Sequence, residues 1–223
     1  MNERDHLFTR IRQALAVPAP KPGAHNGHGR PGLMTVRDVL PATGTTFDEH
    51  VELFRMNAAE LKADFHLVAN ADDLAVQLLR LRDVEGWKKI ASHEGKLTDA
   101  ACRTLQLPVC RTTNGYSISE LEPCDAGLTE CDALVAQTGS VVVTSRSSGG
   151  RALSVLPPHH VVLARREQMV AGLPEAFALV KAKYGADYPS MISFITGPSR
   201  TGDIERILVL GAHGPKKLTV FCV

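Results

Sequence analysis

Residues 128–158 read LTECDALVAQTGSVVVTSRSSGGRALSVLPP, and this stretch decides the fold. It holds two short runs rich in Ala, Val, Leu and Thr, at residues 134–138 and 140–144, separated by a Thr138-Gly139 turn. Such a pattern predicts a hairpin of two strands. The run Val141–Val143 does not alternate with polar residues, so we expect both faces of its strand to be covered.

A loop rich in glycine and hydroxyl groups, Ser145–Arg151, follows the hairpin. Glycines let backbone N–H groups converge, and serine and arginine side chains add donors and positive charge, so the loop favours an anionic ligand. The residues that we expect to bind a ligand here are Thr138, Gly139, Ser147, Gly149, Gly150 and Arg151. The alternative is a surface loop of turn-forming residues.

A second stretch near the C-terminus has the same character. A strand predicted at residues 193–195 leads into Thr196–Asp203, where Ser199, Arg200 and Thr201 are further candidates for ligand binding. Ligands of open α/β sheets bind beyond the carboxyl ends of strands, so we expect both loops to frame a polar cleft. The chain has no Walker loop and no G-x-G-x-x-G motif, which excludes those two phosphate-binding devices.

Two carboxylates, Glu130 and Asp132, come directly before the hairpin. On an extended chain, residues two apart share a face, and adjacent carboxylates raise the pKa of one of them, which suits acid–base chemistry. The alternative is a capping pair at a helix start. His213, between Gly211 and Gly214, is expected either to close one side of the cleft or to cap a hairpin. Glu130, Asp132 and His213 are therefore the candidate catalytic residues.

Helical and strand-like periodicities alternate along the chain. The sequence predicts helices at 48–62, 71–82, 98–105 and 174–184, and strands at 65–69, 87–92, 107–110, 160–164 and 218–223. In the last helix we expect Ala176, Phe177, Val180 and Tyr184 to face inward. The alternation is typical of βαβ units, so the fold class is α/β with a mostly parallel sheet covered on both sides.

The N-terminal residues are set apart from this pattern. Residues 5–17 carry a narrow apolar stripe at helical spacing, and residues 18–32 are rich in Pro, Gly, Ala and His. We therefore predict an N-terminal helical arm with a flexible linker over residues 1–32, and one α/β domain over residues 33–223. The helix is expected to dock either on its own domain or on a partner subunit.

Composition excludes several classes of function. With 25 Lys and Arg against 24 Asp and Glu, the formal charge is +1, which predicts no nucleic-acid partner. No apolar run approaches the roughly 20 residues of a membrane span, and the first residues do not read as a signal peptide, so we expect a cytoplasmic protein. The five cysteines form no C-x-x-C pair, so we expect no metal site and no cofactor in this chain.

Four segments together resemble the LUD domain family, the lactate-utilisation proteins: Cys131–Gly139, Leu156–His160, Ser199–Glu205 and Leu210–Pro215. The resemblance covers roughly residue 68 to the C-terminus. It implies a three-layer sandwich around a mostly parallel sheet, similar to the fold of sugar-phosphate isomerases and CoA transferases. Many relatives carry Glu where this chain has Gln137, so a mechanism that needs a carboxylate there is in doubt.

The resemblance also implies a function. The chain would be a subunit or accessory factor in the oxidation of L-lactate to pyruvate, and iron–sulfur partner proteins would hold the clusters. The residues leave a second hypothesis open, a stand-alone enzyme acting on a small anionic substrate, phosphorylated or CoA-linked, with Arg151 and Arg200 clamping the anion. Whether this chain is itself catalytic stays undecided at this point.

Overall fold

The structure is a computed structural model that describes residues 3–16, 41–204 and 207–223. The chain divides into two units, Met1–Val39 and Leu40–Val223. In the first unit α1 (Glu3–Ala16) is helical, as predicted, and exposes Leu7, Phe8 and Ile11. The predicted linker lies outside the described residues, and the domain boundary at residue 32 stays a prediction.

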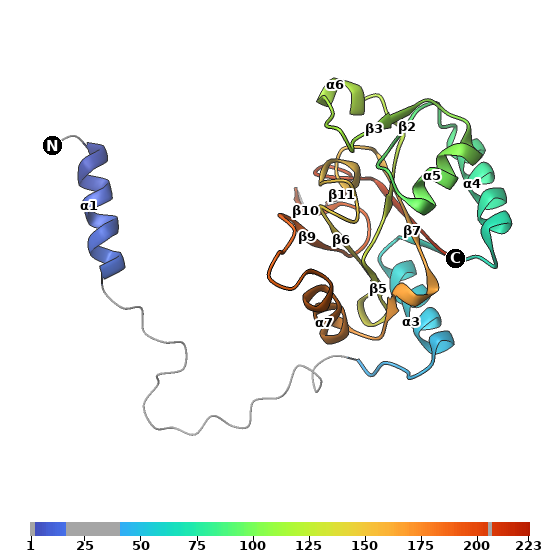
Figure 1. The fold of residues 1–223 in the computed structure, drawn as a ribbon, viewed down its shortest axis with the longest axis horizontal. Helices are drawn as coiled ribbons and strands as arrows, with labels where there is room; N and C mark the ends of the chain where they lie inside the picture. The colour runs from blue at the N-terminus through green and yellow to red at the C-terminus, as the bar shows by residue number, and fades with distance from the viewer. Residues whose placement is uncertain (1–2, 17–40, 205–206) are drawn as a thin grey trace. The chain divides into compact units, whose positions relative to one another are not determined.

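A parallel sheet, here called sheet A, forms the centre of the second unit (Figure 1). Within the described residues it has six strands in the order β1-β12-β7-β4-β2-β3, and every neighbouring pair is parallel. The bounds are β1 (Asp64–Leu67), β2 (Ile90–Ser92), β3 (Val109–Arg111), β4 (Ala126–Glu130), β7 (His159–Ala164) and β12 (Lys217–Cys222).

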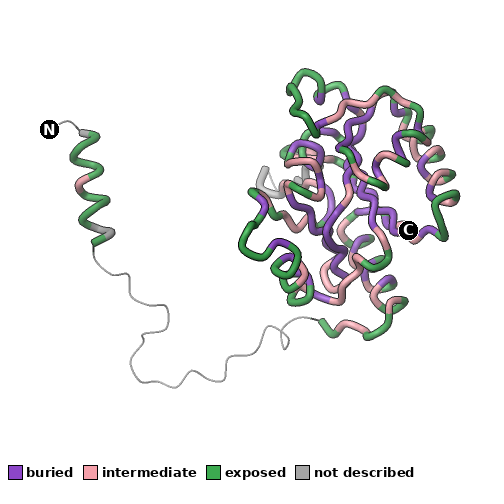
Figure 2. The backbone as a smooth tube through the Cα atoms, viewed as in Figure 1, coloured by how far each residue is buried: buried purple, intermediate pink, exposed green. Residues whose placement is uncertain are grey.

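Side chains alternate between the two faces of sheet A, and different layers cover each face. On β7, Val161 and Leu163 pack toward α4 (Ala71–Glu85) and α5 (Lys96–Leu105), whereas Val162 and Ala164 pack toward α3 (Phe47–Glu60). Figure 2 shows the strands buried between helices whose outer sides are exposed. The predicted α/β fold with helices on both sides of a mostly parallel sheet is confirmed.

The predicted hairpin belongs to a second sheet, sheet B, which the sequence reasoning did not foresee. Its order is β8-β5-β6-β9, with β8 (Met169–Val170), β5 (Ala133–Val135), β6 (Ser140–Thr144) and β9 (Ile192–Ile195). The antiparallel pair β5 and β6 confirms the hairpin, although a 3-10 turn, η1 (Ala136–Thr138), lengthens its connection.

One face of sheet B joins the core against α3 and sheet A, and α7 (Leu173–Tyr184) covers the other. Of the residues expected to face inward on α7, Ala176, Val180 and Tyr184 are buried. Phe177 is instead 58% exposed, because it packs only at the rim of sheet B, against Phe194.

Short elements complete the fold: β10 (Arg200–Ile204), β11 (Ile207–Leu210), α6 (Ile118–Leu121), η2 (Ala152–Ser154) and η3 (Arg166–Gln168). The antiparallel pair β10 and β11 places Arg200 and Thr201 on a strand, where the sequence predicted a loop. Side-chain caps start two helices: Asn70 accepts hydrogen bonds from the first turn of α4, and Thr46 forms a capping box for α3.

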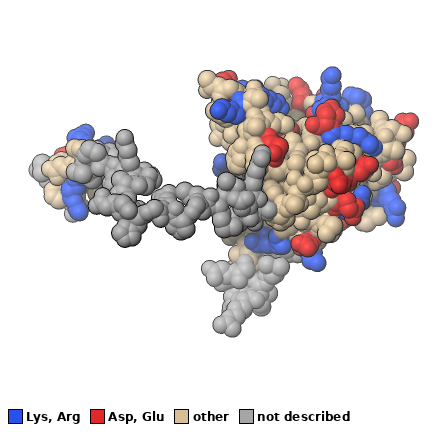
Figure 3. Space-filling model, turned by 90° about the horizontal axis from the view of Figure 1, so that it is seen from below, with Lys and Arg blue, Asp and Glu red and all other residues tan. Residues whose placement is uncertain are grey.

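Charges of both signs share the surface. On the face shown in Figure 3, Lys and Arg side chains lie interspersed with Asp and Glu. None of the helices in the described ranges has the length and apolarity to cross a bilayer.

Candidate functional site

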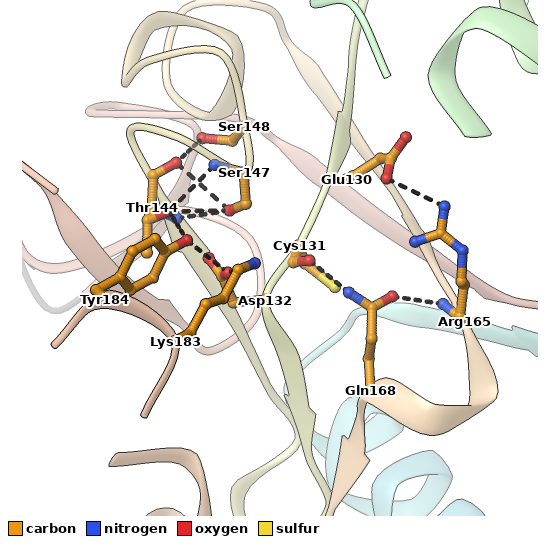
Figure 4. Close-up of polar contacts among 10 residues, drawn as sticks. All are labelled: Glu130, Cys131, Asp132, Thr144, Ser147, Ser148, Arg165, Gln168, Lys183 and Tyr184. Carbon is orange, nitrogen blue, oxygen red and sulfur yellow. Dashed lines mark hydrogen bonds and ion pairs between the residues drawn. The ribbon is translucent and has the colours of Figure 1, made fainter. Parts of the chain in front are cut away.

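The chain passes from sheet A to sheet B at Glu130–Cys131–Asp132, here called the corner, between the end of β4 and the start of β5. The sequence predicted that the two carboxylates share a face. Figure 4 shows them pointing to opposite sides, Asp132 toward α7 and Glu130 toward Arg165. They do not come together as an acid–base pair, because the chain changes sheets between them.

Asp132 is a fully buried carboxylate with two strong donors. Its Oδ1 accepts hydrogen bonds from Lys183 Nζ at 2.5 Å and from Tyr184 Oη at 2.7 Å. Its Oδ2 is buried and has no hydrogen-bond partner among the described residues. Burial acts to raise the pKa of Asp132, but the hydrogen bonds from Lys183 and Tyr184, together with the nearby Ser147 hydroxyl, outweigh it and hold that pKa below the usual value.

The same network fixes the start of the glycine-rich loop. The hydroxyls of Tyr184 and Thr144 lie 3.0 Å apart, and the Thr144 N–H donates to Ser147 Oγ at 2.9 Å. Lys183 is half exposed, and its pKa is raised because the bond to Asp132 outweighs its partial burial. The corner therefore presents one fixed, protonated ammonium to solvent, supported from beneath by a buried carboxylate.

The carboxylate of Glu130 has different partners from that of Asp132. Its Oε1 accepts from the backbone N–H of Leu97, in the first turn of α5, at 2.8 Å, and its Oε2 lies 3.6 Å from Arg165 Nη2. A Cβ at Gly95 would lie 2.5 Å from Oε1, so the carboxylate packs directly on the start of the helix. Glu130 caps α5 from a neighbouring strand, and a catalytic role for its carboxylate stays a prediction.

His93, which directly follows β2, contacts the backbone of the corner at Glu130. Its Nε2 accepts from the Glu130 N–H at 3.0 Å, and its Nδ1 lies 2.9 Å from the carbonyl oxygen of Glu94. A carbonyl can only accept, so the ring is neutral with the proton on Nδ1. Burial lowers the pKa of His93, in agreement with the neutral form.

The glycine-rich loop reaches the carboxyl ends of β2 and β3, where open α/β sheets bind ligands. Gly149 has φ +64°, and a Cβ there would lie 2.2 Å from His93 Cβ, so only glycine fits. Its carbonyl oxygen accepts from Thr112 Oγ1 at 3.2 Å.

The hydroxyls of this loop are largely used by its own backbone. Ser148 Oγ donates to the carbonyl oxygen of Thr144 at 2.7 Å, and Ser147 Oγ accepts from the N–H of Thr144. Arg151 is exposed, and Gly150 adopts φ +103° beside open space. Anion binding by Ser147, Gly149, Gly150 and Arg151 stays a prediction.

Thr138 and Gly139 lie with the second loop, not with the first. A chain of hydroxyls joins Thr138 to Ser140 at 2.7 Å and Ser140 to Thr196 at 2.8 Å. Gly139 and Gly197 both pack on the carboxyl end of α3, since added Cβ atoms would lie 2.9 Å and 2.8 Å from its backbone.

Ser199 and His213 meet in the turn that follows β11. The Ser199 N–H donates to the carbonyl oxygen of Pro215 at 2.9 Å, and Ser199 Oγ accepts from the His213 N–H at 3.4 Å. The His213 side chain is exposed, as is Arg200, and Thr201 is half-buried. The bond from His213 is a backbone bond, so a catalytic role for its ring stays a prediction.

Gly149 of the first loop and Ser199 of the second contact opposite ends of sheet A. A small cavity of about 20 Å³ is lined by Ser199, His160 and Leu218, among others. His160 and Leu218 are the second residues of β7 and β12, whereas His93 and Thr112, which contact Gly149, follow the ends of β2 and β3. Ser154, whose Oγ donates to the Arg151 carbonyl oxygen at 3.0 Å, also lines the cavity, and the clamp of one anion by Arg151 and Arg200 stays a prediction.

Sequence reasoning missed Lys183, Tyr184, Arg165 and Gln168 as members of the corner. The Gln168 amide donates to the carbonyl oxygen of Cys131 at 2.6 Å, and its oxygen accepts from the Arg165 N–H. These partners lie more than 30 residues from the corner, and no local pattern marks them. The one available signal was the inward position predicted for Tyr184.

Metal ligands do not gather at the corner. In the part of the chain that the structure describes, no group of three or more His, Cys, Asp or Glu side chains is placed to hold a metal ion. All five cysteines are free. Burial raises the pKa of Cys124 and Cys222 to about 11 and that of Cys131 further still, so these thiols stay protonated at neutral pH.

Comparisons with known proteins match most of the chain. The profile of the family described as "LUD domain" matches residues 51–223. A protein named lactate utilization protein C from Shouchella clausii is 29% identical over 225 residues, which are 97% of this chain and 96% of that protein. A protein of the same name from Deinococcus radiodurans is 35% identical over 54% of this chain and 56% of its own. A crystal structure of a DUF162 family protein from D. radiodurans matches with a TM-score of 0.64 and 23% identity, covering 81% of this chain and 99% of that one, which shows a shared fold.

Proposed function

Because the chain belongs to the LUD domain family, we propose that it is a lactate-utilisation protein, a subunit or accessory factor in the oxidation of L-lactate to pyruvate. The observation that carries the proposal is the match to lactate utilization protein C of S. clausii, which runs through nearly the whole of both chains. The oxidation releases electrons and protons, and we assign the electrons to iron–sulfur clusters in partner proteins.

We assign the binding of the substrate carboxylate to the corner. Lys183 is half exposed there, protonated, and held in place by Asp132 and Tyr184. An ammonium carries three donors, so one bond to Asp132 leaves others for a carboxylate from solvent. The pairing with Asp132 also weakens the attraction for an anion, so we expect modest affinity and a preference for small acids.

We assign the contact with partner proteins to α1. Leu7, Phe8 and Ile11 are 56%, 44% and 44% exposed, and they share one side of the helix. An isolated helix of this length is marginal in water, so a partner that covers this stripe would stabilise it. A variant that lacks residues 1–39 should keep its melting temperature and lose its iron–sulfur partners in co-purification from lactate-grown cells. Retained co-purification would contradict this assignment.

The alternative, a stand-alone enzyme on a phosphorylated or CoA-linked substrate, has less support. It needs two loops that converge on one anion and a free carboxylate base. Gly149 and Ser199 contact opposite ends of sheet A, and Glu130 accepts a hydrogen bond from the first turn of α5.

The test combines growth with ligand binding. A strain without the protein should fail to grow on L-lactate, and the wild-type chain and Lys181→Gln should restore growth. We expect Lys183→Gln to fail to restore growth. Lys181→Gln is its matched control, because Lys181 is exposed on the same helix. In a thermal-shift assay, lactate or pyruvate at 100 times its dissociation constant should add about 2.7 kcal/mol to the stability of the wild type and of Lys181→Gln. Lys183→Gln should gain no such stability at the same ligand concentration.

The outcomes separate the two parts of the proposal. Normal growth of the deletion strain on L-lactate would refute the lactate-utilisation role. Growth restored by Lys183→Gln would refute only the assignment of the carboxylate to the corner. Immunoblots that show equal protein levels exclude a trivial loss of the variant.

A further inference from the structure

Sheet A ends at β1, which pairs with β12 on its inner side. Among the described residues no strand pairs with its outer side, so backbone N–H and C=O groups of Asp64–Leu67 form an open edge. A groove of about 690 Å³ runs along this edge on the α4 side, lined by His66 and Phe221 with Val76, Arg80 and Val84. A second groove of about 470 Å³ lies on the α3 side, lined by Phe65, Arg55 and Lys62 among others.

The side of α4 that lines the first groove carries apolar side chains that are exposed to solvent. Leu74 and Leu78 bury the inner face of the helix, whereas Val76 and Val84 are 65% and 74% exposed. Residues 76, 80 and 84 follow one another at intervals of four, so they line one side of the helix. Valine is a poor helix former, and burial of these two mostly exposed side chains offsets little of this cost. The stripe has the composition of a surface that is covered in an assembly.

The charges of α4 that make no ion pair among the described residues run in a self-complementary order. Asp72 and Asp73 lie in its first turn and Arg80 follows two turns later, whereas Glu85 at the end of the helix pairs with Lys217. Arg80 makes no ion pair within the described ranges, in contrast to Arg82, which pairs with Asp83. Two antiparallel copies of α4 would place the acidic end of each against Arg80 of the other, and two parallel copies would oppose like charges.

We propose that the β1–α4 edge is a self-association surface on which a second copy of this chain docks about a two-fold axis. β1 pairs antiparallel with β1 of the copy, which continues sheet A, and the two α4 helices lie antiparallel across the joint. A second copy is the occupant that these features favour, because a two-fold axis satisfies the open edge and the charge order at once. With Asp72 opposite Arg80, Val76 of each copy also faces Val76 of the other.

The first test is the oligomeric state of the full chain by sedimentation equilibrium. We expect a dimer, and we expect Val76→Lys to raise its dissociation constant at least about tenfold, because each substitution enters a two-fold interface twice. Ile118→Lys is the matched control, since Ile118 is 68% exposed on α6, away from the edge. Circular dichroism confirms that each variant is folded.

The second test uses the charge order and needs no loss of folding. Arg80→Glu alone and Asp72→Arg alone should each weaken the dimer, because each homodimer then holds two like-charge contacts. A mixture of the two variants should restore dimers. In the heterodimer the two substituted positions face each other with opposite charges again, and the original contact between Asp72 and Arg80 is kept on the other side.

Each result decides the proposal. A wild-type chain that stays monomeric overturns it, and so does a dimer that Val76→Lys and Arg80→Glu leave intact, which would place the interface elsewhere. A mixture that fails to restore dimers overturns the antiparallel arrangement of α4. Dimers weakened by Val76→Lys, kept by Ile118→Lys and restored in the mixture support it.

Discussion

Removal of the Lys183 ammonium should destabilise the protein more than removal of the Asp132 charge. In Lys183→Met, the Asp132 carboxylate stays fully buried and loses its only cationic partner among the described residues. Breaking a buried ion pair from one side costs about 3–5 kcal/mol, and because Lys183 is half exposed we expect roughly 2 kcal/mol. In Asp132→Asn the ammonium is left beside solvent and an acceptor for Tyr184 remains, so the cost is about 1 kcal/mol.

The cost of Lys183→Met should also depend on pH. In the wild type the pKa of Asp132 is below its ordinary value, so its contribution is present at neutral pH and lost as pH falls through that pKa. Without Lys183, burial dominates and raises the pKa above the ordinary value, so the charged form destabilises the fold as pH rises through it. The difference between variant and wild type is therefore largest at neutral pH and shrinks on acidification.

Urea unfolding, followed by the fluorescence of the single tryptophan, Trp87, measures these free energies, because this side chain is buried in the core. Lys181→Met, exposed on the same helix, should stay within about 0.5 kcal/mol of wild type. Equal stabilities of Lys183→Met and Lys181→Met at neutral pH would show that the ammonium does not stabilise the buried carboxylate. A cost of Lys183→Met that grows between about pH 7 and pH 4.5 would contradict the predicted pH dependence.

Three further predictions concern other parts of the site. Gly149→Ala should cost more than about 2 kcal/mol, because φ is +64° and a Cβ there would lie 2.2 Å from a neighbouring side chain, whereas Gly150→Ala, beside open space, should cost about 1 kcal/mol by urea unfolding. Burial lowers the pKa of His160 to about 3, so its ring resonances should not titrate by NMR above about pH 5, and its contribution to stability should be lost as pH falls below about 6.5. Glu130→Gln should cost less than about 1 kcal/mol, since the amide oxygen still accepts from the Leu97 N–H, while Glu130→Ala should cost about 1–2 kcal/mol in the same assay.

The hairpin and the strand–helix alternation were predictable because they depend on neighbours in sequence. Residues 134–144 carry their own turn, and Asn70 and Thr46 mark helix starts that the structure confirms. Sheet B was not predictable, because its pairing of β5 with β8 joins residues about 35 positions apart and two strands of only two or three residues. Such short strands have no periodicity of their own.

The candidate site was only partly predictable for the same reason. The sequence pointed to Glu130 and Asp132, but the chain changes sheets between them, so their side chains point to opposite sides and do not share a face. Their true partners, Lys183 and Arg165, are charged residues of ordinary appearance, and only the path of the chain makes them special. The glycine at 149 was visible as a turn former, yet its contact with the end of β2 depends on tertiary packing.

The position of β12 has a consequence for synthesis on the ribosome. This strand follows every other strand of sheet A in the chain, yet it lies between β1 and β7 and pairs with both. β1, made early, therefore has no place in the sheet until residues 217–222 have emerged. A nascent chain that stalls before them leaves β1 without a partner strand and exposes one edge of β7, a form prone to aggregation and proteolysis.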